Sequence, residues 1–501
     1  MKKNILLLLA FMPFVLDAQS INDYMNISTN RYQSTAKATS MGNAIGALGG
    51  DASNASTNPA GLGLYRRSEF NFSTGLSFND AETTGAYKGS DDIVRAHINQ
   101  FAYIVPFSAR RGGSLVSSTI GFGMNKIADF NRNRYMSAVN GNSSMLDHHT
   151  DYYNNISVDD AINKPIPFTS GNDSEAAYNA WVIDGDNASG YTNRIAQGNY
   201  KGQEVYRTVE ERGRINEWFI SGALNFNNKL YLGATFGIQD LKYYNSIIHE
   251  EFSLSAATAN IDGVDYYLDR YSQNSDLYVS GAGYNLKLGA VYRVTNELRF
   301  GLAFHTPTYY YLNEDYLVNV FSDQINATTD EKKYFDTDQP NNYNEYGLRT
   351  PLRLIASGSY IIGKDASINA EYEYVNYNRG KFDNERVYGV ENNMIRNSLA
   401  SGHNFRIGGE YNVSPAFSFR AGYEYYSSAY NSSNINSDAF YQTLNAGFGY
   451  RWKFTYIDMA YRAGWTEYYT LPYYAYDANN DPLLKNRIMD NLVMLTLGFR
   501  F

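Results

Sequence analysis

The feature that most constrains this 501-residue chain is a set of segments in which apolar and polar residues alternate one by one. In the last segment, Val493, Leu495, Leu497, Phe499 and Phe501 alternate with Met494, Thr496, Gly498 and Arg500. A period of two puts successive side chains on opposite faces of a β-strand. About fourteen such segments follow residue 65, an even number, as a closed bacterial membrane barrel requires.

The connections between these segments alternate between short and long. Short ones lie at 226–229, 294–297, 363–366, 413–416 and 453–454, and long ones at about 131–214, 246–276, 308–343, 379–398 and 470–488. Outer-membrane barrels have short periplasmic turns and long outer loops, whereas a soluble β-sandwich shows no such asymmetry. The sequence therefore predicts an all-β fold, a transmembrane antiparallel β-barrel of about 14 strands over residues 66–501.

The composition is compatible with this prediction. The mean hydropathy of −0.45 resembles that of a soluble protein, but alternating strands average their two faces to such a value. The 47 Tyr residues suit the aromatic girdles at the two surfaces of a bilayer. The net charge of −9 argues against nucleic acid as a partner. The absence of Cys excludes disulfides and thiolate chemistry.

The N-terminus has the pattern of a secretory signal peptide rather than of a buried helix. Lys2 and Lys3 precede an apolar run from Ile5 to Leu16, and Ala18 is a small residue near the expected cut. The run is shorter than the roughly 20 residues of a membrane-spanning helix. We therefore expect residues 1–18 to be removed and the exported chain to begin near Gln19.

A stretch of a different kind precedes the first alternating segment. Residues 42–70 are rich in Gly, Ala, Ser and Asn and poor in the β-branched residues that favour strands. Asn58-Pro59-Ala60-Gly61 fixes one turn, because Pro59 has a set φ and Asn58 can cap the residues that follow. A barrel of about 14 strands is too wide for its own side chains to fill. We therefore predict that residues 19–65 form a plug, or hatch, inside the lumen.

Charged residues in the alternating segments must face one side of the wall. Arg or Lys facing lipid at mid-depth costs roughly 2–4 kcal/mol, so we expect most of these charges to face the lumen. They are Arg299, Glu371, Glu373, Arg406, Glu410, Arg420, Glu424, Arg451 and Arg462. Two interpretations stay open: the charges pair with one another and hold the plug, or some of them bind a substrate headgroup.

Several motifs carry a resemblance to a known family. They are Ser40-Met41-Gly42, Gly49-Gly50-Asp51-Ala52, Asn58-Pro59-Ala60-Gly61-Leu62, Thr350-Pro351 followed by Gly358, and the terminal Phe501. With these motifs the chain resembles the FadL/TodX/OmpP1 family of outer-membrane transport proteins, in the form found in Bacteroidetes. The resemblance implies a monomer in the cell outer membrane, surrounded by outer-membrane lipid, that takes up a hydrophobic small-molecule ligand passively. Long-chain fatty acids and aromatic hydrocarbons are the implied substrate classes.

The resemblance also implies a route. A ligand would enter the barrel, shift the hatch around Asn58, Pro59, Ala60 and Gly61, and leave sideways through a gap where a kink or bulge breaks an early strand. Gly121 and Gly123, in the third alternating segment, are candidates for that gap. Alternatively, these two small residues make room for the plug.

Apolar residues of the predicted plug are candidate ligand contacts. They are Met41, Ile45, Leu48, Leu62 and Leu64. Alternatively, they pack the hatch against the barrel wall.

Other motifs do not indicate chemistry. His148-His149 are adjacent, which is poor geometry for shared metal binding, and the stretch 184–190 departs from a calcium loop at Ala188. The sequence has no G-x-S-x-G motif. We therefore predict no enzyme activity, no catalytic residue, no metal site and no cofactor.

A second functional hypothesis stays open. The chain could be an interaction or secretion-associated barrel that binds protein partners through its long extracellular loops. An uptake channel predicts an apolar pocket above the plug, whereas an interaction barrel predicts a filled lumen and ordered loops.

Overall fold

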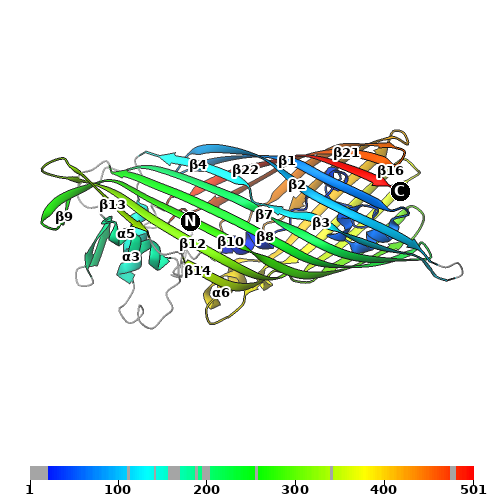
Figure 1. The fold of residues 1–501 in the computed structure, drawn as a ribbon, viewed down its shortest axis with the longest axis horizontal. Coiled ribbons are helices and arrows are strands. Elements are labelled where there is room, and N and C mark those ends of the chain that lie inside the picture. Colours follow the sequence, from blue (N-terminus) through cyan, green and yellow to red (C-terminus); the bar gives the residue numbers. More distant parts are fainter. Residues whose placement is uncertain are drawn as a thin grey trace, which may run out of the picture.

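The chain closes into one antiparallel β-barrel (Figure 1). The computed structural model describes residues 21–109, 113–139, 143–155, 170–186, 190–193, 203–253, 258–338, 342–473 and 481–501. β1 (Glu69–Gly85) pairs with β2 (Gly89–Ser108) on one side and with β22 (Leu484–Arg500) on the other. The β1–β22 ladder runs from Glu69↔Arg500 to Gly85↔Leu484, so first and last strands seal the wall. The predicted signal peptide, residues 1–18, lies outside the described residues.

The described strands cross the wall in fourteen passes, which we call staves. After β1 and β2 come β3 (Leu115–Asp129) continued by β4 (Arg132–Ala138), β7 (Gln203–Phe226), β8 (Leu230–Ser253), β10 (Val264–Arg293), and β11 (Leu298–His305) continued by β12 (Tyr309–Asn326). Next come β13 (Lys332–Asp338) with β14 (Asn342–Arg349) and β15 (Arg353–Ile362), β16 (Ala366–Asn376) with β17 (Lys381–Phe382), β18 (Ser401–Asn412), β19 (Phe417–Tyr426), β20 (Tyr441–Trp452), β21 (Thr455–Thr470) and β22. The predicted antiparallel β-barrel of about 14 strands is confirmed.

The five short turns predicted from the sequence all connect staves at the end where the chain stops at Phe501. The turn between β7 and β8 places Asn227 and Asn228 at φ of 52° and 53°, the left-handed backbone that a tight hairpin with right-handed twist needs. Short turns mark the periplasmic end of an outer-membrane barrel. The opposite end, where β9 and β13 are labelled in Figure 1, is therefore the outer one.

An apolar belt surrounds the periplasmic part of the barrel. On β8 the outward side chains from Leu230 to Ile238 are exposed and mostly apolar, and Asp240 and Lys242 follow on the same face. This length agrees with the roughly 9–11 residues that a tilted strand needs to cross a bilayer. The barrel and its belt place the chain in an outer membrane.

Most of the strands continue outside the belt, where the sequence predicts loops. Residues 246–276 and 308–343 are largely strand: β8 runs to Ser253, β9 covers Thr258–Ile261, and β10 and β12 pair along their length. These two loop predictions are wrong. Beyond the bilayer the outward face becomes polar, so the alternation that identifies a strand is lost while the backbone ladder persists.

An extracellular cap lies over the inner faces of these long strands. It consists of α3 (Met145–Asn155), α5 (Ser170–Asn179), β5 (Ile183–Asp186) and β6 (Gly190–Asn193). Ser322 donates a hydrogen bond to the Ala180 carbonyl (2.5 Å), and Leu146, Ala176 and Val182 are fully buried. The long loop predicted at 131–214 therefore contains ordered structure in its described parts. Two further short elements are η3 (Tyr377–Arg379) and α6 (Gly389–Ser398).

The N-terminal segment, residues 21–65, lies within the ring of strands (Figure 1). Its elements are α1 (Ile21–Ser28), α2 (Ala36–Ser40), η1 (Ala52–Ala55) and η2 (Pro59–Leu64). α2 contacts β19 to β22, whereas η2 contacts β3, β7, β8 and β10 on the other side. No helix among the described residues has the length and apolar character needed to cross a membrane.

A charged side chain on the lipid-facing surface tests how far the apolar belt extends along a strand. Leu302 faces outward on β11 and is 65% exposed. We expect Leu302→Arg to lower the free energy of unfolding by roughly 2–4 kcal/mol, because the guanidinium would face hydrocarbon near mid-depth. Asp315→Arg, on the same stave but outside the belt, should cost less than about 1 kcal/mol. Urea unfolding from lipid vesicles, followed by Trp fluorescence, measures both; equal losses would contradict the belt.

Candidate functional site

The turn at Asn58–Gly61 fits closely against the barrel wall. Asn58 begins η2: its Oδ1 accepts a hydrogen bond from the Ala60 N–H (3.2 Å), and its Nδ2 donates to the Ala290 carbonyl (3.3 Å). A Cβ on Gly233 would lie 2.3 Å from the carbonyl carbon of Pro59. Glycine in the strands therefore allows the turn to approach the wall backbone.

The five apolar candidates for ligand contact pack the segment in place. Met41 and Ile45 form a buried cluster with Leu48 at its edge. Leu62 packs with Ile104 and Phe219, and Leu64 packs beside Tyr231. None of the five lines the polar cavity described below. In this structure the five side chains therefore occupy packing positions, as the second of the two interpretations describes.

Charged wall residues hold the N-terminal segment through directional bonds. Arg406 pairs with Glu371 (Nη1–Oε1, 2.7 Å) and with Glu373, and Glu371 also accepts a hydrogen bond from the Gly46 N–H (3.1 Å). Arg353 contacts Glu373 (2.8 Å) and donates to the Ser28 carbonyl. Paired in this way, the buried charges avoid the large cost of an isolated ion.

The same arrangement recurs on the other walls of the barrel. Ser56 donates a hydrogen bond to Glu217 (2.7 Å), which also pairs with Lys287, and the Arg299 guanidinium donates to the Leu48 carbonyl (2.8 Å). Of the two open interpretations for the lumen charges, these contacts correspond to the first, in which the charges hold the plug.

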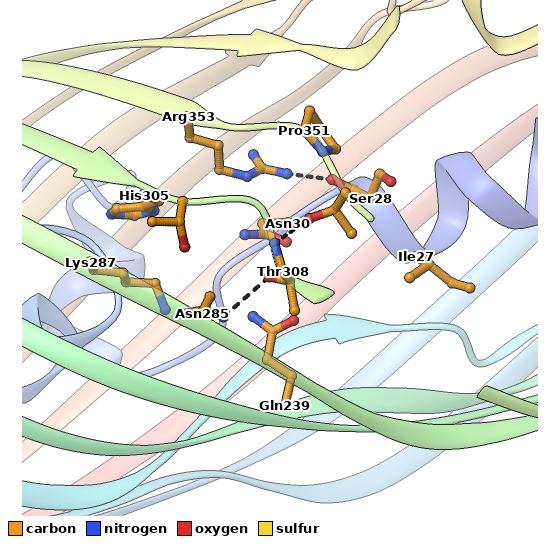
Figure 2. Close-up of a pocket in the computed structure, with 12 residues that line it drawn as sticks. Ile27, Ser28, Asn30, Gln239, Asn285, Lys287, His305, Thr308, Pro351 and Arg353 are labelled. Atoms are coloured by element: carbon orange, nitrogen blue, oxygen red, sulfur yellow. Dashed lines mark hydrogen bonds between the residues drawn. The ribbon is translucent and has the colours of Figure 1, made fainter. Parts of the chain in front are cut away.

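A small polar cavity lies between the N-terminal segment and the wall (Figure 2). It has a volume of about 10 Å³, which is room for about one water molecule. Lys287, His305 and Arg353 surround it, and Asn30 enters it from the segment. It lies where two neighbouring staves break at Pro307 and Pro351. At this level side chains therefore fill most of the lumen.

Above this polar layer α1 occupies the lumen and packs mainly against apolar side chains. Tyr24 and Ile27 of α1 are at most 4% exposed. The inward side chains around them form the α1 chamber, which includes Ile127, Ala128, Phe130, Ile215, Leu241, Tyr243, Leu277, Val279, Tyr310, Leu312, Tyr346, Leu348, Val375 and Tyr377. The apolar region is thus occupied by α1, which is itself part of the predicted plug. A lumen filled in this way is what the interaction barrel predicts, whereas the open apolar pocket predicted for an uptake channel is not found there among the described residues.

The wall is interrupted between β2 and β3. Their ladder runs from Ser108↔Ser117 to Gln100↔Asn125 and ends there. Beyond it, residues 93–98 of β2 pair only with β1, and residues 128–129 of β3 and 132–138 of β4 pair with β7. We call this interruption the β2–β3 break. The β1–β2 register shifts at the same place, leaving Asn99 as a bulge between Ile98 and Gln100.

The N-terminal segment takes the place of the missing partner strand. The Arg31 N–H donates to the Ile127 carbonyl (2.8 Å), and the Gln33 N–H donates to the Lys126 carbonyl (3.1 Å). Gln33 and Lys126 form an antiparallel bridge. Backbone polar groups in a membrane need internal partners, so residues 31–33 satisfy part of the β3 edge that β2 leaves.

The β2–β3 break lies at the outer part of the apolar belt. Val94 and Ile98 face outward there and are 54% and 52% exposed, and Val94 pairs with the outward Phe78 of β1. On the inner side, Ile127 and Phe130 belong to the α1 chamber. The interruption therefore adjoins lipid on one side and, on the lumen side, both the α1 chamber and the buried polar side chains of His97, Lys126 and Asp129.

Gly121 and Gly123 lie beside the β2–β3 break but not in it. Gly121 pairs with Ile104 and Gly123 with Ala102 in an unbroken ladder. A Cβ on Gly121 would lie 3.6 Å from Leu62. The position of Gly121 agrees with the alternative interpretation, room for the plug, whereas a Cβ on Gly123 would meet Phe101 and Phe219 of the wall. A role of either residue in the gap stays a prediction.

The sequence contains a signal for the bulge that the predicted sites omit. Outward residues Val94, Ala96 and Ile98 are followed by Phe101, Tyr103 and Val105, so the period-two phase slips by one at Asn99 and Gln100. The roles of Arg31, Gln33 and α1 carry no comparable pattern, because they depend on contacts between distant parts of the chain.

A buried polar cluster joins the extracellular cap to the strands. His149 of α3 contacts Ser174 (Nδ1–Oγ, 3.1 Å) and Gln273 (Nε2–Oε1, 3.0 Å), and Asp173 of α5 accepts a hydrogen bond from Tyr316 (2.9 Å). Burial lowers the pKa of His149 to about 3 and raises the pKa of Asp173 to about 7. The neutral forms of both groups are thus favoured in the folded cap.

Comparison with solved structures identifies barrels of the same fold. A Pseudomonas aeruginosa FadL homologue is 13% identical, with a TM-score of 0.57, over 94% of this chain and 99% of that chain. The Pseudomonas putida toluene transporter TodX is 11% identical, with a TM-score of 0.50, over 95% and 100%. No protein-family model matches the chain, and no curated protein does.

Adding a Cβ at wall glycines that contact the Asn58–Gly61 turn tests whether close packing holds the N-terminal segment against the wall. A Cβ on Gly289 would lie 2.1 Å from Asn58 Oδ1. We expect Gly289→Ala and Gly233→Ala to push the Asn58–Gly61 turn off the wall and so to raise single-channel conductance. Gly222→Ala is the matched control, because its Cβ would meet nothing within 4 Å. Equal conductance in all three variants would contradict this seating.

The cap should loosen as pH rises. The pKa of Asp173, about 7 in the folded cap, lies above the ordinary value, so the folded state binds the extra proton. The stabilisation of the folded cap by protonated Asp173 is therefore complete at acid pH and is lost as pH rises through about 7. We expect proteolysis within α5, in wild type relative to Asp173→Asn, to be faster at about pH 9 than at about pH 5. A ratio that does not change with pH would contradict the assignment.

Proposed function

We propose that the chain is an outer-membrane channel for passive uptake of hydrophobic compounds, and not an enzyme. One observation carries the proposal: an apolar chamber inside the lumen adjoins an interruption of the wall at belt depth, through Ile127 and Phe130. An apolar molecule in that chamber can reach the bilayer without crossing the polar layer below.

In the proposed cycle the ligand exchanges with α1. The helix is held in its chamber largely by apolar burial, worth about 25 cal/mol per Å², and an apolar ligand restores the same kind of contact. Moving residues 21–33 releases the hydrogen bonds from Arg31 and Gln33 to β3, the bond from Tyr24 to the Tyr377 carbonyl, and the bond from Arg353 to the Ser28 carbonyl. A neutral hydrogen bond contributes about 0.5–1.5 kcal/mol net and one from a charged group about 1.5–3 kcal/mol, and ligand binding is proposed to supply the difference.

The layer below α1 is proposed to stay closed during this cycle. The contacts of Gly46, Ser56 and Asn58 with the wall are directional and partly charge-assisted. We infer that the Asn58–Gly61 turn is an anchor and that residues 21–33 are the moving part. This arrangement would pass an apolar solute sideways while keeping water and ions from crossing.

The substrate class that we propose is long-chain fatty acids or aromatic hydrocarbons. The α1 chamber offers aliphatic and aromatic surface, including Tyr243, Tyr310 and Tyr346. Two cations near the chamber, Arg353 and Lys287, already pair with Glu373 and Glu217, so affinity is proposed to come from the apolar part of the ligand. The channel is proposed to act as a monomer among outer-membrane lipids.

The ordered extracellular cap favours a second candidate, a barrel that binds protein partners on its outer side. The two functions differ in what the cap contacts. Cross-linking on intact cells followed by pull-down would yield a stoichiometric protein partner for an interaction barrel. An uptake channel would yield none and would instead retain hydrophobic ligand.

A reversible lock tests the proposed route. The chain has no Cys, and an antiparallel pair such as Gln33 and Lys126 has a Cα separation of about 4.5–5.5 Å, which suits a disulfide. We expect oxidised Gln33→Cys/Lys126→Cys to reduce uptake of a fluorescent long-chain fatty acid into proteoliposomes to the rate without protein. Reduction should restore uptake, because it frees residues 31–33.

The control for this lock is a disulfide in an unbroken part of the wall. Ala421 and Ala446 are direct partners in the β19–β20 ladder, so Ala421→Cys/Ala446→Cys should form a disulfide without changing uptake. Full uptake by the completely cross-linked Gln33–Lys126 variant would rule out the route through the β2–β3 break.

A further inference from the structure

The lipid-facing wall carries an apolar groove on staves far from the β2–β3 break. The groove has a volume of about 480 Å³. Its floor and sides are formed by Ala356, Gly358, Ala370, Phe300, Phe405 and Ile407, and we call it the wall groove. These residues lie on β11, β15, β16 and β18, within the apolar belt.

The wall groove results from small residues among large ones. Phe300, Phe405 and Ile407 are 51–53% exposed and project from the wall. Between these large side chains, the small residues Ala356, Gly358 and Ala370 form a depression in the surface. A Cβ on Gly358 would come no closer than 3.8 Å to any side chain, so close packing does not require glycine there. The space above it is free for a ligand.

The outer end of the wall groove is polar. Tyr372 and Tyr423 line it, and their hydroxyls reach His403 Nδ1 and Gln442 Oε1, both at 2.7 Å. His403 is exposed on β18 and lies nearer the outer end of that strand than Phe405. The Tyr372 ring is 5.1 Å from the Phe405 ring and 6.1 Å from that of His403. Apolar and polar parts therefore form one continuous surface.

We propose that the wall groove binds one acyl chain of an outer-leaflet membrane lipid, whose headgroup contacts His403 and the neighbouring tyrosine hydroxyls. The belt location means that hydrocarbon surrounds the groove. The polar outer end matches a ligand that carries a headgroup at membrane-surface depth on the same molecule. A chain lying in the groove contacts the wall on three sides and gains more dispersion contact than on a flat wall.

This site is independent of the proposed uptake route. The strands that form it pair continuously from β11 to β19 within the belt. Ser357, Glu371 and Arg406 also line the groove. The side chains of Glu371 and Arg406 pair with each other at no more than 3% exposure, and Glu371 accepts a hydrogen bond from Gly46 of the N-terminal segment, so both side chains turn to the lumen. An acyl chain in the groove therefore stays on the outside of the wall and does not enter the lumen.

Photolabelling of the intact barrel tests the site. The probe is a phosphatidylethanolamine with a diazirine in one acyl chain, in vesicles of the same lipid. We expect labelled peptides to concentrate on β11, β15, β16 and β18. Ala356→Phe and Ala370→Phe fill the floor and should lower that labelling roughly tenfold, because several buried methylene contacts are lost. Ala234→Phe, an outward alanine on β8, is the matched control and should leave it unchanged.

The headgroup contact has a separate test. His403→Ala leaves the apolar floor intact and should lower lipid labelling several-fold. A diazirine alkane without a headgroup should label the groove weakly and should not respond to His403→Ala. Alkane labelling as strong as that of the lipid would overturn the lipid assignment. Even labelling around the belt, or undiminished labelling of folded Ala356→Phe and Ala370→Phe, would overturn the site itself.

Discussion

Every backbone N–H and C=O group within a bilayer needs a partner from the protein, and this requirement organises the whole chain. It is met by closure of β1 on β22. At the β2–β3 break the strands stop satisfying one another, and residues 31–33 of the N-terminal segment bond to the exposed edge of β3. At the site proposed for ligand exit, the hydrogen bonds that the edge of β3 needs are therefore supplied by the N-terminal segment inside the lumen.

Two kinds of contact hold the N-terminal segment at two different levels of the lumen. In the lower layer, directional bonds from Glu217, Glu371 and Arg299 fix the segment in one position. In the upper layer, α1 is buried mainly against apolar side chains, and hydrophobic contact has no directional preference. An apolar molecule can replace α1 there, whereas few molecules could replace the bonds below. This difference supports the proposal that the N-terminal segment contains both an anchor and a moving part.

Much of the wall could be predicted from the sequence, because each transmembrane stave alternates apolar and polar residues on its own. The lumen-facing charges follow from the same pattern, as Arg406 and Glu371 illustrate. The sequence wrongly predicts loops at 246–276 and 308–343, because strands outside the bilayer need no apolar outward face. The sequence suggests Gly121 and Gly123 as candidates for the lateral gap, and both lie in the unbroken β2–β3 ladder beside the interruption. The interruption itself is marked in the sequence by the phase slip at Asn99 and Gln100.

The sequence by itself determined an outer-membrane barrel of fourteen staves, because strand period and turn length are local properties that one segment at a time reveals. Only the tertiary structure decided that α1 occupies an apolar chamber, that Gln33 meets Lys126, and that small residues on β15 and β16 lie among aromatic side chains of other strands. These arrangements join residues far apart in the chain. Closure and register of the barrel bring them together, and no local pattern encodes them.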